Sequence, residues 1–125
     1  MVVGVGIDVA SIERIRAVLE RHGDRFWRRV LTEREQALLG ARRDRAVALA
    51  GRWAAKEAAI KALRGRTGYA YQLFEILRAK GDEPRIEFRG RAADVAAELG
   101  VVRAHVSITH DAGVAAAVVV LEGQP

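Results

Sequence analysis

Cysteine is absent from this chain of 125 residues. That absence excludes disulfide bonds, zinc-thiolate sites and a thiol nucleophile, whatever the function is. Long apolar runs are missing too, since none approaches the roughly 20 residues that a membrane-spanning helix needs. Residues 1–6 lack the charged lead and the cleavage site of a secretory signal. We therefore expect a cytoplasmic protein with no membrane partner.

Lysine and aromatic residues are scarce. Three lysines stand against eighteen arginines, and aromatic residues make up 6% of the chain. Two of the lysines, Lys56 and Lys61, nevertheless fall in the alanine-rich segment from Trp53 to Ala62. Because an α-helix turns by about 100° per residue, Trp53, Glu57 and Lys61 would share one stripe of a helix there. A compact ammonium beside a carboxylate suits a site that handles a phosphate and a hard cation together.

Positive charge is concentrated in one part of the chain. The net charge is +5, and residues 14–52 hold eleven arginines. This excess predicts an anionic partner, either a nucleic acid, an acidic protein or a phosphorylated ligand. A small nucleic-acid-binding domain would interleave aromatic with basic side chains on a sheet, whereas the aromatic residues here are scattered. We therefore expect no nucleic acid partner and keep this class as an alternative.

The pattern of caps and breaks predicts a single α+β domain over residues 1–125, with an antiparallel sheet packed on a long helix. Ser11 and the capping box Thr32–Glu35 begin helices that stop at Gly23 and Gly40. The alanine content and the absence of proline predict the longest helix at residues 44–63. A short helix is expected at 91–99, and strands at 2–9, 71–80, 85–88, 103–109 and 114–121, the last two as a hairpin.

Two carboxylates stand on rigid elements of this predicted domain. Asp8 ends a hydrophobic strand, and Glu57 lies in the middle of an otherwise apolar helix. Such a pair can supply oxygen ligands to Mg²⁺, which keeps several waters and takes further ligands from a substrate phosphate. The alternative is structural: Asp8 would cap the next helix, and Glu57 would be an exposed residue paired with Lys61.

Three motifs together resemble the holo-(acyl-carrier-protein) synthases, the small bacterial 4′-phosphopantetheinyl transferases. The motifs are Gly6-Ile7-Asp8 followed by Arg14, Trp53-Ala54-Ala55-Lys56-Glu57-Ala58 with Lys61-Ala62, and His105-Val106-Ser107-Ile108-Thr109-His110. They occur in the family's order and at its spacing. The resemblance implies the family's fold and a Mg²⁺-dependent transfer of the phosphopantetheine arm from coenzyme A to a serine of apo acyl carrier protein. The other product is adenosine 3′,5′-bisphosphate, and the activity belongs to lipid metabolism, with a fatty-acid or a polyketide carrier.

The resemblance also implies roles for individual residues. Asp8 and Glu57 would hold Mg²⁺ against the pyrophosphate, and Lys61 would stabilise the departing phosphate. The proton of the serine hydroxyl needs an acceptor, for which a metal-bound water, Glu57 and His110 stay open. The residues implied in coenzyme A binding are Arg45, Arg52, Lys61, Pro84 and His105.

Each of these residues has a structural alternative. Arg45 and Arg52 could belong to a solvated helix face, and His105 could be a half-buried sheet histidine with a satisfied hydrogen bond. His110 could be a turn histidine at the mouth of the last hairpin. Pro84 closes the turn 81–84, which is one residue longer than the Gly-x-Pro turn usual in the family.

The first helix is the predicted carrier-binding surface. Arg14, Arg21, Arg25 and Arg28 would line one side of this helix if it continued through Gly23. Acyl carrier proteins are small and strongly acidic, so such a row would attract and orient them. Arg14 is carried over from the resemblance, and the other three rest on the surface argument.

The last strand predicts an assembly. Residues 114–121 have no polar alternation, so both faces of the strand must be covered, whereas one helix covers only one face. The resemblance implies a homotrimer with its sites at subunit interfaces. A non-catalytic module that binds coenzyme A or a carrier protein is the remaining alternative; it requires damage at a chemical residue, yet Asp8, Glu57 and Lys61 are all present.

Overall fold

The fold is α+β, as the sequence predicts. The computed structural model describes residues 1–40, 44–78 and 83–125. Its elements, in chain order, are β1 (Val2–Ser11), α1 (Ile12–His22), α2 (Asp24–Val30), α3 (Glu33–Leu39), α4 (Arg45–Ala62), the 3₁₀ helix η1 (Tyr71–Leu73), β2 (Phe74–Leu77), β3 (Arg85–Phe88), α5 (Gly90–Glu98), β4 (Val101–Asp111) and β5 (Val114–Gly123). The long strands form an antiparallel sheet in the order β1-β5-β4, and β2 pairs with β3 in a separate two-stranded ribbon.

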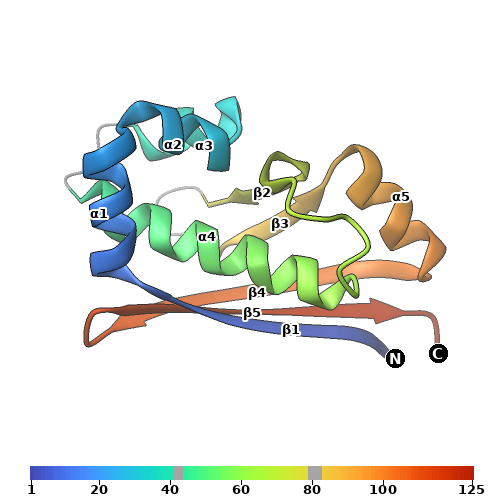
Figure 1. Ribbon diagram of the computed structural model, residues 1–125. Coiled ribbons are helices and arrows are strands. Elements are labelled where there is room, and N and C mark those ends of the chain that lie inside the picture. The colour runs from blue at the N-terminus through green and yellow to red at the C-terminus, as the bar shows by residue number, and fades with distance from the viewer. Residues whose placement is uncertain (41–43, 79–82) are drawn as a thin grey trace.

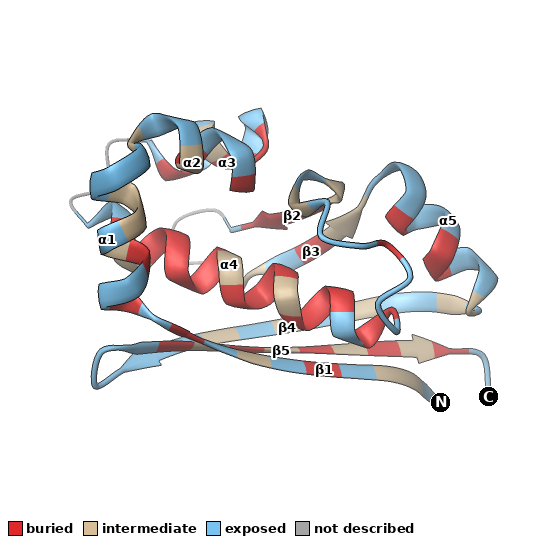
Figure 2. Cartoon of the chain, in the orientation of Figure 1, coloured by how far each residue is buried: buried red, intermediate tan, exposed pale blue. Residues whose placement is uncertain are grey.

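The long helix α4 lies between the sheet and the rest of the chain. One face of the β1-β5-β4 sheet packs against α4, while α1 to α3 and the β2–β3 ribbon lie on the other side of that helix (Figure 1). Most of α4 is buried, as Figure 2 shows. None of the described elements covers the opposite face of the sheet.

Two glycines of β1 allow α4 to lie unusually close to the sheet. A Cβ atom added to Gly6 would stand 1.8 Å from the carbonyl oxygen of Ala58, and one added to Gly4 would stand 2.4 Å from that of Ala62. No side chain fits such a gap. The alanines of α4 and the glycines of β1 therefore act together, and they set the distance between the strand that carries Asp8 and the helix that carries Glu57.

The helix boundaries predicted from the sequence are largely confirmed. The Ser11 side chain accepts a hydrogen bond from the backbone N–H of Arg14 and begins α1, and Thr32 and Glu35 form the expected capping box of α3. Asp44 begins α4 and pairs with both terminal nitrogens of Arg16, at 3.3 Å each. The hydrogen bond with Arg16 holds the pKa of Asp44 below its usual value. The hairpin of β4 and β5 also forms, with Ala112 and Gly113 at positive φ in its turn.

One expectation about local structure is wrong, and the condition attached to another is not met. Tyr71 to Leu73 form a 3₁₀ helix, so the strand expected from Tyr71 begins only at Phe74. Its expected end at Lys80 lies outside the described residues. The helix stop predicted at Gly23 is confirmed: this residue has φ 57° and ψ −139°, and residues 24–30 form a helix of their own, so α1 does not continue through Gly23. The predicted arginine row is therefore divided, with Arg14 and Arg21 on α1 and Arg25 and Arg28 on α2.

A buried ion pair links α4 to α3. Lys56 is fully buried, and its Nζ atom donates to Glu35 Oε1 at 2.5 Å and to the carbonyl oxygen of Val30 at 2.6 Å. Glu35 also accepts from the backbone N–H groups of Thr32 and Ile76. Burial lowers the pKa of Lys56, and the charge of Glu35 opposes that shift. Lys56 is thus paired inside the protein, whereas the Lys61 side chain, five residues further on, is 55% exposed.

None of the helices in the described part of the chain is long and apolar enough to cross a membrane.

Candidate active site

Asp8 and Lys61 meet at the contact between β1 and α4. Asp8 lies two residues beyond Gly6, and because side chains alternate along a strand it shares the face that Gly6 turns to α4. The Nζ atom of Lys61 lies 3.0 Å from both Asp8 Oδ1 and the carbonyl oxygen of Ile7. The Asp8 side chain is 18% exposed and that of Lys61 is 55% exposed. An ammonium therefore stands at the open edge of a half-buried carboxylate.

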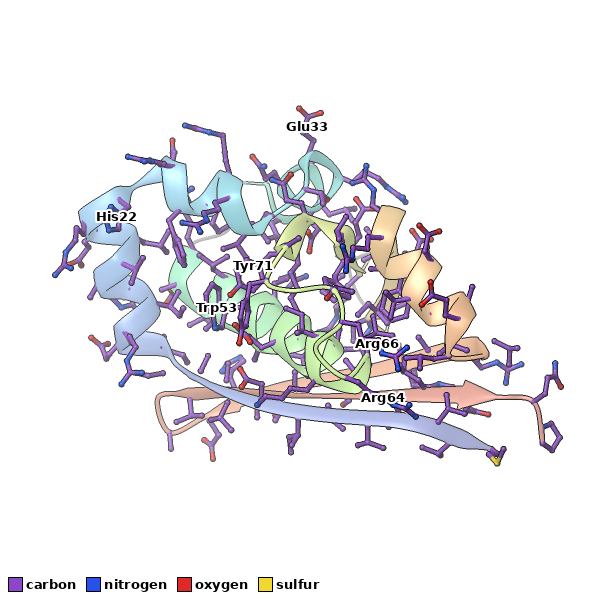
Figure 3. The ribbon with its side chains drawn as sticks, turned by 45° about the vertical axis from the view of Figure 1, so that its right-hand side comes forward. His22, Glu33, Trp53, Arg64, Arg66 and Tyr71 are labelled. Carbon is purple, nitrogen blue, oxygen red and sulfur yellow. The ribbon has the colours of Figure 1, made fainter. Side chains whose placement is uncertain are left out.

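Glu57 lies one helical turn before Lys61 and has a different partner. Its Oε1 atom accepts a hydrogen bond from the Tyr71 hydroxyl at 2.8 Å. The Tyr71 ring packs on Trp53, with centroids 4.7 Å apart, and Figure 3 shows these two rings side by side. Burial, together with the hydrogen bond to Glu57, raises the pKa of Tyr71. The phenol therefore stays protonated at neutral pH and acts as the donor.

These contacts contradict the structural alternatives for the two carboxylates. The cap of α1 is Ser11, not Asp8, and Lys61 pairs with Asp8 and not with Glu57. The predicted stripe of Trp53, Glu57 and Lys61 is present. These three positions are half-buried or exposed, whereas the residues between them on α4 are buried. The helix thus directs an aromatic ring, a carboxylate and an ammonium to one edge of the sheet.

The two carboxylates fit a Mg²⁺ ion that takes its other ligands from outside the chain. In the described residues, Asp8 Oδ2 and Glu57 Oε2 have no hydrogen-bond partner, while Oδ1 and Oε1 are held by Lys61 and Tyr71. Those residues contain no cluster of three or more His, Asp or Glu side chains that could hold a metal alone. One or two carboxylates with waters and substrate phosphates are the usual ligand set of Mg²⁺, so the donor atoms of this pair fit such an ion.

The two candidate histidines lie on opposite faces of the sheet. His110 is opposite Ala115 on β5, and Asp8 is opposite Ala117; both alanines are buried on the face that packs against α4. His105 is opposite Val120 on the outer face, and its Nε2 atom is hydrogen-bonded to Glu122. Within one chain, His105 therefore cannot join the face that carries Asp8. The hydrogen bond also holds the pKa of Glu122 below its usual value.

The other residues predicted to bind coenzyme A are spread around α4. Arg45 pairs with Asp24 at 2.9 Å, and its guanidinium lies 4.3 Å from the centre of the Trp27 ring. Arg52 is buried, with 7% of the residue exposed, so the expectation of a solvated helix face does not hold for it. Pro84 is half-buried just before β3. The structure thus pairs Asp8 with Lys61, with Glu57 one helical turn earlier on α4, and gives Arg45 and His105 other partners.

The predicted carrier surface is exposed but not continuous. Arg14, Arg21 and Arg25 are exposed, and the break at Gly23 separates the first two from the third. Arg25 also borders a small hollow with His22, Phe26 and Arg29. The positive charge of the predicted carrier surface is therefore divided between two short helices, α1 and α2.

A cavity of about 600 Å³ lies away from this site. It is lined in part by Arg28, Arg34, Glu75 and Arg89. Arg34 lies 3.5 Å and Arg89 3.6 Å from the buried carboxylate of Glu75, so two of its cations are paired within the chain. The cavity holds a structural ion-pair network, and Asp8, Glu57 and Lys61 are not among its lining residues.

Two residues near the site, Tyr71 and Glu35, make contacts that were not predicted from the sequence. Tyr71 was predicted to lie in a strand, and no local pattern indicates that its hydroxyl reaches a helix fourteen residues earlier. Glu35 was recognised only as a capping residue, although it is also the partner of Lys56. No local pattern pairs these two residues, because they lie 21 positions apart in the sequence.

The fold and the site define a class: an α+β transferase-like domain with a carboxylate on its first strand and a carboxylate and a lysine on its long helix. The family model of the 4′-phosphopantetheinyl transferase superfamily matches residues 4–119. The chain therefore belongs to the 4′-phosphopantetheinyl transferase superfamily, and it is an enzyme of that group.

Individual relatives agree with this assignment. A holo-[acyl-carrier-protein] synthase of Anaeromyxobacter sp. (strain K) is 44% identical over 126 residues, covering 98% of each chain. A crystal structure of the holo-ACP-synthase of Plasmodium yoelii is similar at a TM-score of 0.87 with 26% identity, covering 100% of this chain and 98% of that one. The holo-[acyl-carrier-protein] synthase of Helicobacter pylori in complex with coenzyme A has a TM-score of 0.79 and 32% identity, over 94% of this chain and 99% of that one.

Proposed function

We propose that residues 1–125 act as one domain that transfers 4′-phosphopantetheine from coenzyme A to a serine of apo acyl carrier protein in a Mg²⁺-dependent reaction. The observation that carries the proposal is the meeting of Asp8 and Lys61 beside Glu57, at the closest approach of β1 and α4. The names of the relatives support the same reaction, and one of them is described in complex with coenzyme A.

The reaction exchanges one phosphorus–oxygen bond for another. The serine oxygen of the carrier attacks the pantetheine-bearing phosphorus of coenzyme A, and the bond from that phosphorus to the bridging oxygen breaks. The phosphopantetheine arm stays on the serine, and adenosine 3′,5′-bisphosphate leaves with the bridging oxygen. The serine proton must pass to a base, since the pKa of an alcohol lies far above 7.

The chain's own residues would divide this work. Asp8 and Glu57 would hold Mg²⁺, which when bound neutralises charge that develops on the phosphoryl oxygens. Lys61 would bind the same phosphates, and its 55% exposed side chain has the freedom to turn from Asp8 toward a ligand. Glu57 and His110 stay candidates for the base, and both are on the α4 side of the sheet.

We further propose that the working form is a homotrimer with shared sites. The support comes from His105, which lies on the sheet face opposite Asp8 and could reach such a site only from a neighbouring subunit. Arg45, Arg52 and Pro84 would complete the coenzyme A cleft, and Arg14, Arg21 and Arg25 would receive the acidic carrier. A role in fatty acid biosynthesis and a cytoplasmic location stay predictions.

The test is a direct assay of the carrier. The protein is incubated with apo acyl carrier protein, coenzyme A and Mg²⁺, and the carrier is weighed by mass spectrometry. A mass gain of one phosphopantetheine arm, absent when coenzyme A or the enzyme is omitted, establishes the transfer. No gain with any divalent metal would leave only the reading of a non-catalytic binding module. Removal of the metal with a chelator is expected to abolish the mass gain of the carrier.

A further inference from the structure

Tyr71 is placed so that it fixes the carboxylate of Glu57. Its hydroxyl donates to Glu57 Oε1 at 2.8 Å, and in the described residues this is the one hydrogen bond of the Glu57 side chain. Glu57 is half-buried, and a glutamate side chain has three rotatable bonds that an unpartnered carboxylate would leave free. The hydrogen bond therefore restricts the direction in which the carboxylate points.

The position of Tyr71 is itself fixed from two sides. Its ring packs on Trp53, which lies one turn before Glu57 on the same stripe of α4. The next residue, Gln72, donates from Nε2 to the carbonyl oxygens of Arg28 and Leu31, at 2.6 and 3.2 Å. The 3₁₀ helix that carries Tyr71 is therefore hydrogen-bonded to the end of α2, which restricts where the Tyr71 hydroxyl can lie.

The hydrogen bond occupies one oxygen of Glu57 and leaves the other for a ligand. An ionised carboxylate has two oxygens that accept hydrogen bonds or metal ions, so a donor on Oε1 does not block Oε2. Lys61 treats Asp8 in the same way, since it holds Oδ1. Groups of this kind orient metal ligands in other proteins, and their removal typically weakens metal binding by about 10- to 100-fold.

We propose that Tyr71 is a positioning residue that holds Glu57 Oε1, so that Oε2 is presented to the Mg²⁺ of the active site. The inference rests on the proposed function, because it assigns Glu57 to the metal. Tyr71 itself touches neither substrate nor metal in this role, and its ring is held by Trp53 whether or not the hydroxyl is present.

The test compares Tyr71→Phe with Tyr69→Phe. The first variant keeps the ring on Trp53 and loses only the hydroxyl. The second removes a neighbouring hydroxyl whose residue is 72% exposed and which donates to none of the described residues. Mn²⁺ binding in the presence of coenzyme A is measured by electron paramagnetic resonance. We expect Tyr71→Phe to weaken Mn²⁺ binding about tenfold and Tyr69→Phe to leave it unchanged.

Two further measurements separate positioning from a structural role. Saturating Mg²⁺ should restore most of the kcat of Tyr71→Phe, with the defect confined to the concentration of metal that is required. In a Glu57→Gln background, Tyr71→Phe should cause no further loss of Mn²⁺ affinity, because the two residues act as one unit. The inference is overturned if Tyr71→Phe causes an equal loss of Mn²⁺ affinity in the wild-type and Glu57→Gln backgrounds. It is also overturned if Tyr71→Phe alone binds Mn²⁺ within twofold of wild type.

The proposed function fails in a different way. If Glu57→Gln lowers Mn²⁺ affinity and Tyr71→Phe does not, then only the role of Tyr71 is wrong. If the wild-type protein neither binds Mn²⁺ with coenzyme A nor modifies the carrier, the metal site is wrong, and the inference falls with it.

Discussion

At the scale of single residues, the proposed chemistry rests on two carboxylates, each of which keeps one oxygen for an outside ligand. Asp8 is held by Lys61 from α4, and Glu57 is held by Tyr71 from η1. Each carboxylate is therefore oriented by a group from a different segment. A small shift of β1, α4 or η1 would alter the spacing of Asp8 Oδ2 and Glu57 Oε2 without removing either carboxylate.

Glu57→Gln should remove most of the transferase activity and leave the fold intact, because the amide keeps the shape and loses the charge that holds the cation. Asp8→Asn should behave alike, and a loss of about 100-fold or more is expected for each. Initial rates by mass spectrometry, with circular dichroism as the fold check, measure the effect. Glu98→Gln, an exposed carboxylate on α5, is the matched control. Activity within a few-fold of wild type for both site variants would sink the metal assignment.

At the scale of elements, α4 is held on two sides by unlike means. Against the sheet it packs through alanines onto Gly4 and Gly6, where only backbone fits. On its other side the Lys56–Glu35 ion pair fastens it to α3, and Glu35 also holds the backbone of β2 at Ile76. Glu57 follows Lys56 directly, so the ion pair and the carboxylate proposed to bind Mg²⁺ share one turn of helix.

Lys56→Met should destabilise the protein by about 3–5 kcal/mol, because it leaves the carboxylate of Glu35 buried without its charge partner. Thermal unfolding followed by circular dichroism measures the loss as a fall in Tm. The double variant with Glu35→Gln should recover part of the stability, since it removes the uncompensated charge. The control is Arg85→Met on β3, which removes a positive charge at an exposed position and should change the Tm little. A Tm for Lys56→Met equal to that of the control contradicts the structural role.

Local signals predicted the elements well where a cap or a break fixes the backbone. Ser11, the Thr32–Glu35 box and the hairpin of β4 and β5 depend on neighbouring residues, and all three are confirmed. Tyr71 was misplaced because an aromatic residue beside an apolar run has the pattern of a strand. Its real position depends on Trp53 and on contacts with α2, which no local window contains. The meeting of Asp8 and Lys61, 53 positions apart, likewise came from the resemblance and not from a local pattern.

Reversing charge at Arg14 and Arg21 on α1 should raise the KM for the carrier protein, more strongly at low salt, and change the KM for coenzyme A little. Both side chains are exposed, and their part would be attraction of an acidic protein, which salt screens. Steady-state kinetics with each substrate varied in turn is the measurement, and Arg85→Glu on β3 controls for net charge. A rise in the KM for coenzyme A instead would assign α1 to the nucleotide cleft.

At the scale of the whole molecule, the outer face of the β1-β5-β4 sheet is the feature without a role inside one chain. Val5, Ile7 and Val9 of β1 are about 60% exposed there, at 59%, 63% and 61%. Opposite them on β5 are Val120, Val118 and Ala116, so the apolar surface continues across the pair. His105 lies on this same face, opposite Val120. An exposed apolar patch that includes a predicted substrate-binding residue is the expected form of a subunit interface with shared sites.

Val118→Glu should therefore dissociate the assembly and abolish turnover, because it places a charge in the middle of this apolar face and separates His105 of one subunit from Asp8, Glu57 and Lys61 of the next. Sedimentation velocity paired with the mass assay is the measurement, and Ala93→Glu, which puts the same charge on an exposed position of α5, should stay assembled and active.

Mixing gives the sharpest form of this test of the shared site. Inactive His105→Ala and Glu57→Gln subunits are dissociated and reassembled at equal amounts, and about a quarter of the sites would then pair an intact His105 with an intact Glu57 if each site spans two chains. Activity should reappear in the mixture although neither variant has it alone. A sedimenting monomer of Val118→Glu that keeps full turnover, or a mixture that stays inactive although both parents assemble, refutes the shared site, because a site built within one chain needs no neighbour and gains nothing from one.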